Sequence, residues 1–139
     1  MTNKEQKEFV DVGSDSEIFV PESAIDQITH LSKFCHGVVS QYGQAFGQDI
    51  NEWNDLSKSE QQHYIARVAH FMAYPESTAG DPHEAWKMRL LLNGWSYGHE
   101  LNADRKTRPE LVFFSQLPPE QQAVDYIIKG IVHGAFQQE

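Results

Sequence analysis

The chain has 139 residues, and its 11 Lys and Arg against 20 Asp and Glu give a formal net charge of -9 at pH 7. The length suits one compact domain with a continuous core. The acidic balance argues against bulk nucleic-acid binding, because that affinity comes from Lys and Arg displacing counterions. With 40% hydrophobic residues, the composition also excludes a wholly disordered chain and predicts a soluble globule.

The sequence shows no membrane or secretion signal. No apolar run approaches the roughly 18–20 residues needed to cross a bilayer, and the polar residues 1–8 lack the apolar stretch of a signal peptide. Cys35 is the single cysteine, so neither an internal disulfide nor a multi-cysteine zinc site can form. We therefore expect a cytoplasmic protein without metal or cofactor, and Cys35 is expected to be a small buried residue.

Residues 1–20 are predicted to form an acidic, loosely ordered lead to a single helical domain over residues 21–139. This segment carries five acidic groups and a Gly-Ser turn, and it has little helical periodicity. The alternative is that its few apolar residues dock as an extended strap.

Two helices are predicted in the first half of the domain. Apolar residues over 24–46 recur at spacings of three and four and so share one helical face, with Ser23 as the expected N-cap. A second helix is predicted to begin after Ser57, because Ser57 and Glu60 have the spacing of a capping box. Pro75 is expected to end it.

A third helix has the clearest start in the chain. Asp81 is expected to cap it, Pro82 suits the first helical position, and Glu84 has the spacing that closes a capping box. Gly94 is suited to the left-handed residue that follows a helix. The sequence thus predicts a short helix of about three turns.

The remaining residues predict a long loop and a last helix. Residues 94–116 lack a sustained helical period, and the β-prone patch at 111–114 is a candidate for a short extended piece. The last helix is expected to begin at Pro118 or Pro119. We therefore expect an all-α fold of about four main helices, arranged as two helical hairpins with a long ordered loop.

Residues 86–109 are the only net-positive stretch, with five basic and two acidic groups. Rings stack on bases while Arg and Lys pair with phosphate or carboxylate oxygens, so this mixture favours a ligand that is both anionic and aromatic, such as a nucleotide. The alternative is that the tryptophans are core anchors. The ligand-binding residues predicted are His83, Trp86, Arg89, Trp95, Tyr97, Lys106 and Arg108.

Signatures of catalysis are mostly missing. His83-Glu84 resembles the start of a zinc-protease helix, but Lys87 occupies the position of the second histidine. The chain has no nucleophile elbow, P-loop or dinucleotide fingerprint. We expect no enzyme activity; a hydrolase that uses His83 and Glu84 is the weakest alternative.

Several motifs together resemble the RyR domain, the repeat first described in ryanodine receptors and also found as a stand-alone domain in bacteria and phages. The motifs are His83-Glu84-Ala85-Trp86, Asn93-Gly94-Trp95-Ser96-Tyr97-Gly98, Lys106-Thr107-Arg108-Pro109-Glu110-Leu111-Val112 and Leu117-Pro118-Pro119-Glu120-Gln121-Gln122. The strongest resemblance covers residues 81–135. The family often carries a histidine where this chain has Arg108.

The resemblance implies an all-helical, non-catalytic module that binds nucleotides or nucleotide-derived signals in phage defence or counter-defence, in the host cytoplasm if the chain is phage-encoded. The expected partner is therefore a small anionic ligand such as a nucleotide, with neither bulk nucleic acid nor a membrane. The alternative function is a protein–protein interaction module that contacts a host protein or a second copy of itself, using Phe113, Phe114 and the acidic faces.

Overall fold

The structure is a computed structural model and describes residues 7–11 and 17–136. Its main elements are four α-helices: α1 (Ile25–Gln44), α2 (Lys58–Ala73), α3 (Asp81–Leu92) and α4 (Pro119–Phe136). Three short 3-10 helices connect them, at Glu22–Ala24, Trp53–Asp55 and Phe114–Gln116. The prediction of an all-α fold with four main helices is confirmed.

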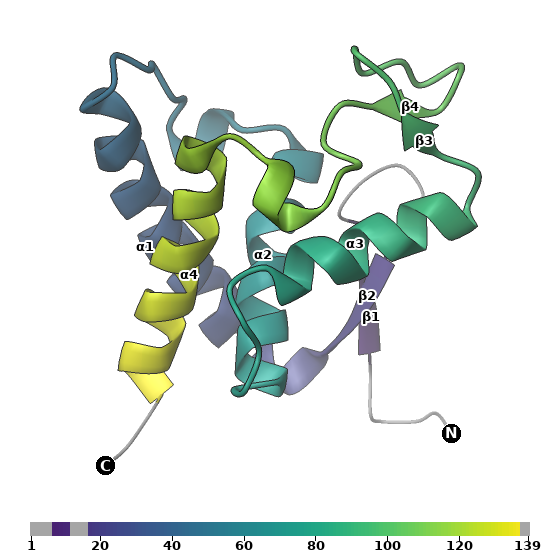
Figure 1. Ribbon diagram of the computed structural model, residues 1–139. Coiled ribbons are helices and arrows are strands. Elements are labelled where there is room, and N and C mark those ends of the chain that lie inside the picture. Colours follow the sequence, from purple (N-terminus) through teal and green to yellow (C-terminus); the bar gives the residue numbers. More distant parts are fainter. Residues whose placement is uncertain (1–6, 12–16, 137–139) are drawn as a thin grey trace, which may run out of the picture.

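Helix α2 is the centre of the packing. It lies against both α1 and α4, α1 and α4 also contact each other, and α3 crosses α2 on another side (Figure 1). The expected second hairpin therefore differs from the observed arrangement, because α4 packs on α1 and α2 rather than along α3. The core cluster between the helices is formed by Ile28, Cys35, Ala66, Val68, Ala69, Phe71, Trp86, Leu90, Trp95, Leu111, Ile128 and Val132.

The backbone of residues 7–21 contains an antiparallel pair of strands, β1 (Lys7–Asp11) and β2 (Glu17–Pro21), in which Phe9 is opposite Phe19. Strand β1 lies against α2. This is the segment expected to be a loosely ordered lead with a strap as the alternative; residues 1–6 and 12–16 of it lie outside the described residues. The division into a lead and a domain stays a prediction.

Some of the helix ends were predicted correctly from the residues next to them in sequence, and one was not. The capping box at the start of α2 is confirmed, since Ser57 N donates to Glu60 Oε1 at 2.9 Å and Glu60 N donates to Ser57 Oγ at 3.0 Å. Gly94 has the expected left-handed backbone, with φ of 93°. The expected cap at Ser23 is wrong, because Ala24 is the residue before α1 and no side chain caps it.

The capping box expected for α3 is also wrong. The carboxylate of Asp81 accepts from Thr78 N and Thr78 Oγ1, both at 2.9 Å, and Gly80 occupies the N-cap. Glu84 instead accepts from Phe114 N at 2.7 Å, a residue 30 positions away. The Glu84 carboxylate thus binds an amide from a distant part of the chain in place of an amide in the first turn of its own helix.

The long loop contains a small parallel pair, β3 (Ser96–Tyr97) and β4 (Thr107–Arg108). Gly98 permits this pairing, because a Cβ there would lie 2.6 Å from Thr107 Cβ. The extended piece expected at 111–114 does not form. Its Val112 carbonyl and Phe114 amide bond to the side chains of α3, so these groups do not take part in a strand.

Among the described helices, none combines the length and the apolar character needed to cross a membrane.

Candidate functional site

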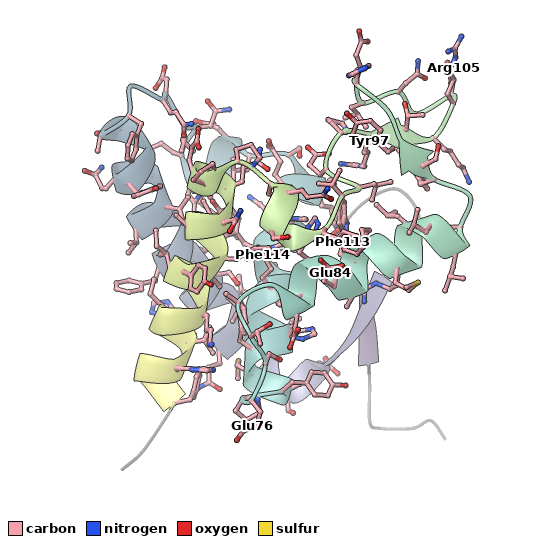
Figure 2. All side chains as sticks on the ribbon, in the orientation of Figure 1. Glu76, Glu84, Tyr97, Arg105, Phe113 and Phe114 are labelled. Carbon is pink, nitrogen blue, oxygen red and sulfur yellow. The ribbon has the colours of Figure 1, made fainter. Side chains whose placement is uncertain are left out.

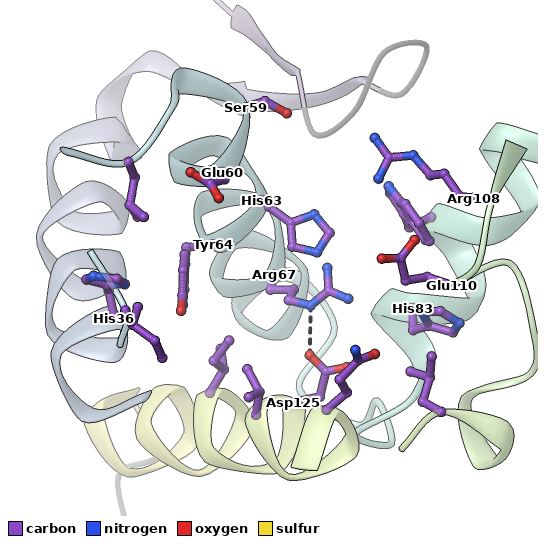
Figure 3. A pocket seen from close by; sticks show the side chains of 17 residues that line it. His36, Ser59, Glu60, His63, Tyr64, Arg67, His83, Arg108, Glu110 and Asp125 are labelled. Carbon is purple, nitrogen blue, oxygen red and sulfur yellow. Dashed lines mark hydrogen bonds and ion pairs between the residues drawn. The ribbon is translucent and has the colours of Figure 1, made fainter. Parts of the chain in front are cut away.

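A pocket of about 410 Å³ lies between α2, α4 and the segment that follows β4, with residues of α1 and α3 completing its wall (Figure 3). Its volume is within the range of about 300–1,000 Å³ typical of small-molecule sites. The charged residues that line it are Glu60, Arg67, Arg108, Glu110 and Asp125. The residues that contribute rings are His36, His63, Tyr64, His83 and Trp86.

A buried ion pair forms one end of the pocket. Arg67 on α2 and Asp125 on α4 are separated by 58 residues in sequence, and Arg67 Nε donates to Asp125 Oδ1 at 2.7 Å. Their side chains are only 10% and 3% exposed. Asp125 is in helical phase with the buried Ile128 and Val132, so the packing of α4 on α2 fixes the position of the pair. Figure 3 shows the rest of the Arg67 guanidinium turned toward the pocket.

Arg108 is held over two tryptophans. Its Cζ lies 5.6 Å from the ring centre of Trp86 and 5.2 Å from that of Trp95, within the range of cation–π attraction. Strand β4 carries Arg108, and Trp95 comes just before β3, so the pairing of β3 with β4 brings the two together. Arg108 Nε is buried and has no hydrogen-bond partner within the described residues.

His83 forms part of the wall and ties α3 to the loop. Its Nε2 donates to the Val112 carbonyl at 2.8 Å, because a carbonyl can only accept. Burial lowers the pKa of His83 below its ordinary value, although the Val112 carbonyl acts in the opposite direction. The imidazole is therefore neutral at pH 7 and serves as a fixed donor to the backbone.

The opposite wall consists of packed rings. His36 Nε2 donates to the Asn51 carbonyl at 2.8 Å, and the His36 ring meets Trp53 and Tyr64 edge-on, at 5.9 and 5.2 Å between ring centres. Burial raises the pKa of Tyr64 to about 12, so its hydroxyl stays protonated at neutral pH. This wall offers flat ring surfaces to a ligand.

Two reactive side chains of the chain, Cys35 and Glu84, lie outside the pocket lining. Cys35 is fully buried, burial raises the pKa of its thiol to about 12, and it does not line the pocket. Glu84 also lies outside the lining; its carboxylate pairs with Lys87 Nζ at 2.9 Å. Within the described residues, no group of three or more His, Cys, Asp or Glu could hold a metal ion.

The structure separates the seven predicted ligand-binding residues into two groups. His83, Trp86 and Arg108 line the pocket, whereas Arg89, Trp95, Tyr97 and Lys106 do not. Trp86 and Trp95 are 4% and 3% exposed, which matches the alternative that they are core anchors. Whether any of the seven contacts a ligand stays a prediction.

The four residues away from the pocket have other surroundings. Trp95 is in the core, whereas Tyr97 is exposed on β3, opposite Arg108 in β4; Figure 2 shows Arg105 farther out in the loop. Lys106 has φ of 58°, and its Nζ donates to the Asn93 carbonyl at 3.0 Å, which ties the loop to the end of α3. Arg89 is half-buried, and burial lowers its pKa.

Sequence reasoning missed most of the polar lining, namely Glu60, His63, Tyr64, Arg67, Glu110 and Asp125. One signal for the ion pair was available. Asp125 occurs in the apolar stripe of its helix, and Arg67 lies between the buried Ala66 and Val68. A charged residue at a buried position requires a partner, so the two positions could have been paired. Glu110 gives no such signal, since it lies in a loop.

A comparison with known protein families finds a match over part of the chain. No curated protein matches the chain. The model of the RyR domain family matches residues 65–129, a range that contains both members of the Arg67–Asp125 pair as well as His83, Trp86 and Arg108. The resemblance to the RyR domain that the sequence motifs indicated is therefore confirmed over residues 65–129.

Proposed function

We propose that the protein binds a small anionic ligand of the nucleotide class in the pocket between α2 and α4, without transforming it. The observation that carries this proposal is Arg108. Its guanidinium is held against Trp86 and Trp95, and its buried Nε lacks a partner within the described residues. An unsatisfied buried donor costs free energy, and an anionic group of a ligand would satisfy it.

A second guanidinium strengthens the proposal. Arg67 uses its Nε for Asp125, while the other N–H groups of its fork are turned toward the pocket (Figure 3). Two arginines on one pocket suit phosphate or carboxylate oxygens, because each guanidinium can donate two parallel hydrogen bonds. The rings of Tyr64 and Trp86 in the same lining give a base apolar surface to pack against.

The proposed setting follows the RyR domain. We propose a receptor for a nucleotide-derived signal in phage or bacterial defence or counter-defence, acting in the cytoplasm and without enzyme activity. The pocket volume of about 410 Å³ suits a single small molecule and not a polymer. The net charge of -9 is also unfavourable for a nucleic-acid backbone.

The test is a calorimetric and thermal-shift screen of mono-, di- and cyclic nucleotides and ADP-ribose derivatives. A ligand present at 100 times its dissociation constant should add about 2.7 kcal/mol to the free energy of unfolding. Arg108→Gln should weaken binding roughly 10- to 100-fold, because it removes the charge from the pocket wall. Arg105→Gln makes the same change on an exposed side chain and should leave the affinity unchanged.

Two results would contradict the proposal. One is the absence of a shift with every compound in the screen. The other is an equal loss of affinity in Arg108→Gln and Arg105→Gln, which would indicate general electrostatic attraction in place of a defined site.

The second candidate function is a protein-interaction module, and Phe113 is the observation that favours it. Phe113 is 62% exposed next to α3, with Lys87 Nζ 4.0 Å from its ring centre. Phe114 is only half-buried and packs toward Tyr126 (Figure 2). Light scattering of the wild type and of Phe113→Ser tests self-association; a monomeric wild type at high concentration contradicts that form of the hypothesis.

A further inference from the structure

Glu110 brings a carboxylate into a pocket that already contains two arginines, yet it forms an ion pair with neither of them within the described residues. Arg67 is paired with Asp125, and Arg108 lies over the two tryptophans. Glu110 Oε1 is buried and has no hydrogen-bond partner in the described part of the chain. Figure 3 shows the carboxylate facing the interior of the pocket, across from Arg67.

The buried, unpaired Glu110 Oε1 lowers the stability of the folded protein when no ligand is bound. A buried acceptor without a donor keeps the full cost of its desolvation, and the cost is larger for a charged group. Helix capping does not account for Glu110, because it lies in the loop between β4 and the 3-10 helix at Phe114–Gln116. A donor supplied from within the pocket would satisfy the atom.

We propose that Glu110 is the specificity-determining residue of this pocket and accepts a hydrogen bond from a donor that the ligand carries close to its anionic group. This inference rests on the proposed function. The arginines attract the anionic group of the ligand, while a carboxylate can only accept hydrogen bonds. A ligand that places a donor beside Glu110 is therefore favoured over inorganic phosphate or pyrophosphate, which offers the pocket little except acceptor oxygens.

In a nucleotide, two groups supply such donors. The ribose hydroxyls lie near the phosphate, and the N–H groups of a base such as guanine lie on its edge. Both sources present the same chemistry to Glu110, so ligands that lack one donor at a time distinguish them.

The experiment measures affinity by calorimetry for wild type, Glu110→Gln and the control Glu76→Gln. Glu76 is exposed and does not line the pocket, so the two variants make the same change of charge inside and outside the site. The probes are pyrophosphate, GMP, IMP, which lacks the 2-amino group, and 2′-deoxy-GMP.

We expect wild type to bind GMP more tightly than pyrophosphate, and Glu110→Gln to lose at least tenfold in affinity for GMP, while Glu76→Gln changes it less than threefold. The loss should shrink for the probe that lacks the donor: for IMP if the base is the source, and for 2′-deoxy-GMP if the ribose is. Without ligand, Glu110→Gln should unfold at the same denaturant concentration as wild type or a higher one.

The failures are distinguishable. If wild type binds none of the nucleotides, the proposed function is overturned and this inference with it. If wild type binds GMP and Glu110→Gln binds it equally well, the inference alone is overturned. A ligand-free Glu110→Gln protein that is clearly less stable than wild type also overturns it, because Glu110 would then have a structural role.

Discussion

The pocket wall and the loop over residues 94–108 contain the same kinds of residue in different settings. The loop has three basic residues within four positions, Arg105, Lys106 and Arg108, yet Tyr97 and Arg105 are exposed (Figure 2). The pocket combines Arg67 from α2, Asp125 from α4 and Arg108 from the last strand of the loop. The basic residues that are neighbours in sequence form an exposed surface on the loop, whereas residues from helices distant in sequence pack together to form the pocket.

The loop still contributes to the site through its base. The β3–β4 pair holds Arg108 over Trp86 and Trp95, so the end of the loop supplies a charged group while the tip does not. We infer that the loop is a support for one wall of the pocket, and the following variants compare groups of the core and the pocket with exposed groups of the loop.

The largest effect is expected for Trp95→Ala, at the base of the loop. Trp95 is 3% exposed within the core cluster, and the Arg108 guanidinium lies over its ring. Truncation to alanine should therefore lower the free energy of unfolding by about 4 kcal/mol. Tyr97→Ala, at an exposed position of β3, should change it by less than about 0.5 kcal/mol. Urea unfolding measures both; similar losses for the two variants would contradict the distinction.

A somewhat smaller loss is expected for Asp125→Asn, which leaves Arg67 buried without its counter-charge. The free energy of unfolding should fall by about 3 kcal/mol, the lower end for a broken buried pair, because asparagine still offers a carbonyl acceptor. Asp104→Asn, on an exposed side chain of the loop, is the matched control and should change little.

The double variant Arg67→Met with Asp125→Leu separates the effect of the ion pair on stability from the effect of Arg67 on ligand binding. Replacing both members of a buried pair by apolar residues removes the desolvation cost together with the attraction, so stability should return to within about 1 kcal/mol of wild type. Ligand affinity should not return, because the pocket would still lack the Arg67 guanidinium. Full recovery of both properties would show that Arg67 does not contact the ligand.

The smallest effect concerns pH. Because burial lowers the pKa of His83 in the folded state, the unfolded chain takes up a proton first as pH falls below about 6.5. Stability contributed by the neutral imidazole is therefore present above that pH and is lost as pH falls toward the folded-state pKa, with a slope below about 1.4 kcal/mol per pH unit. The lowered pKa of His70 acts in the same direction.

Unfolding measured at intervals between pH 7.5 and 5 checks this expectation. His83→Gln, which keeps an N–H donor for the Val112 carbonyl, should flatten the profile, whereas His99→Gln on the exposed loop should not. A profile that is unchanged by His83→Gln would show that the imidazole is not the responsible group.

Predictions from the sequence were most accurate where neighbours along the chain decide the structure. The Ser57–Glu60 capping box and the left-handed Gly94 were found because both depend on residues within one turn. The box at Asp81 failed for a nonlocal reason: Glu84 bonds Phe114 N, 30 residues away, and so is not available for its own helix. The strand expected at 111–114 failed for the same reason, as its backbone bonds to α3.

Periodicity and capping were enough to predict the helical class and the positions of the four helices, because both act over a few residues. The motifs that resemble the RyR domain were also visible in the sequence, as were the pocket residues His83, Trp86 and Arg108. Which charges face a common pocket became clear from the folded structure alone. The pairing of Arg67 with Asp125, and the exposure of Glu110 to the same space, depend on the packing of α4 against α2 and on the course of the loop, and no local pattern encodes those contacts.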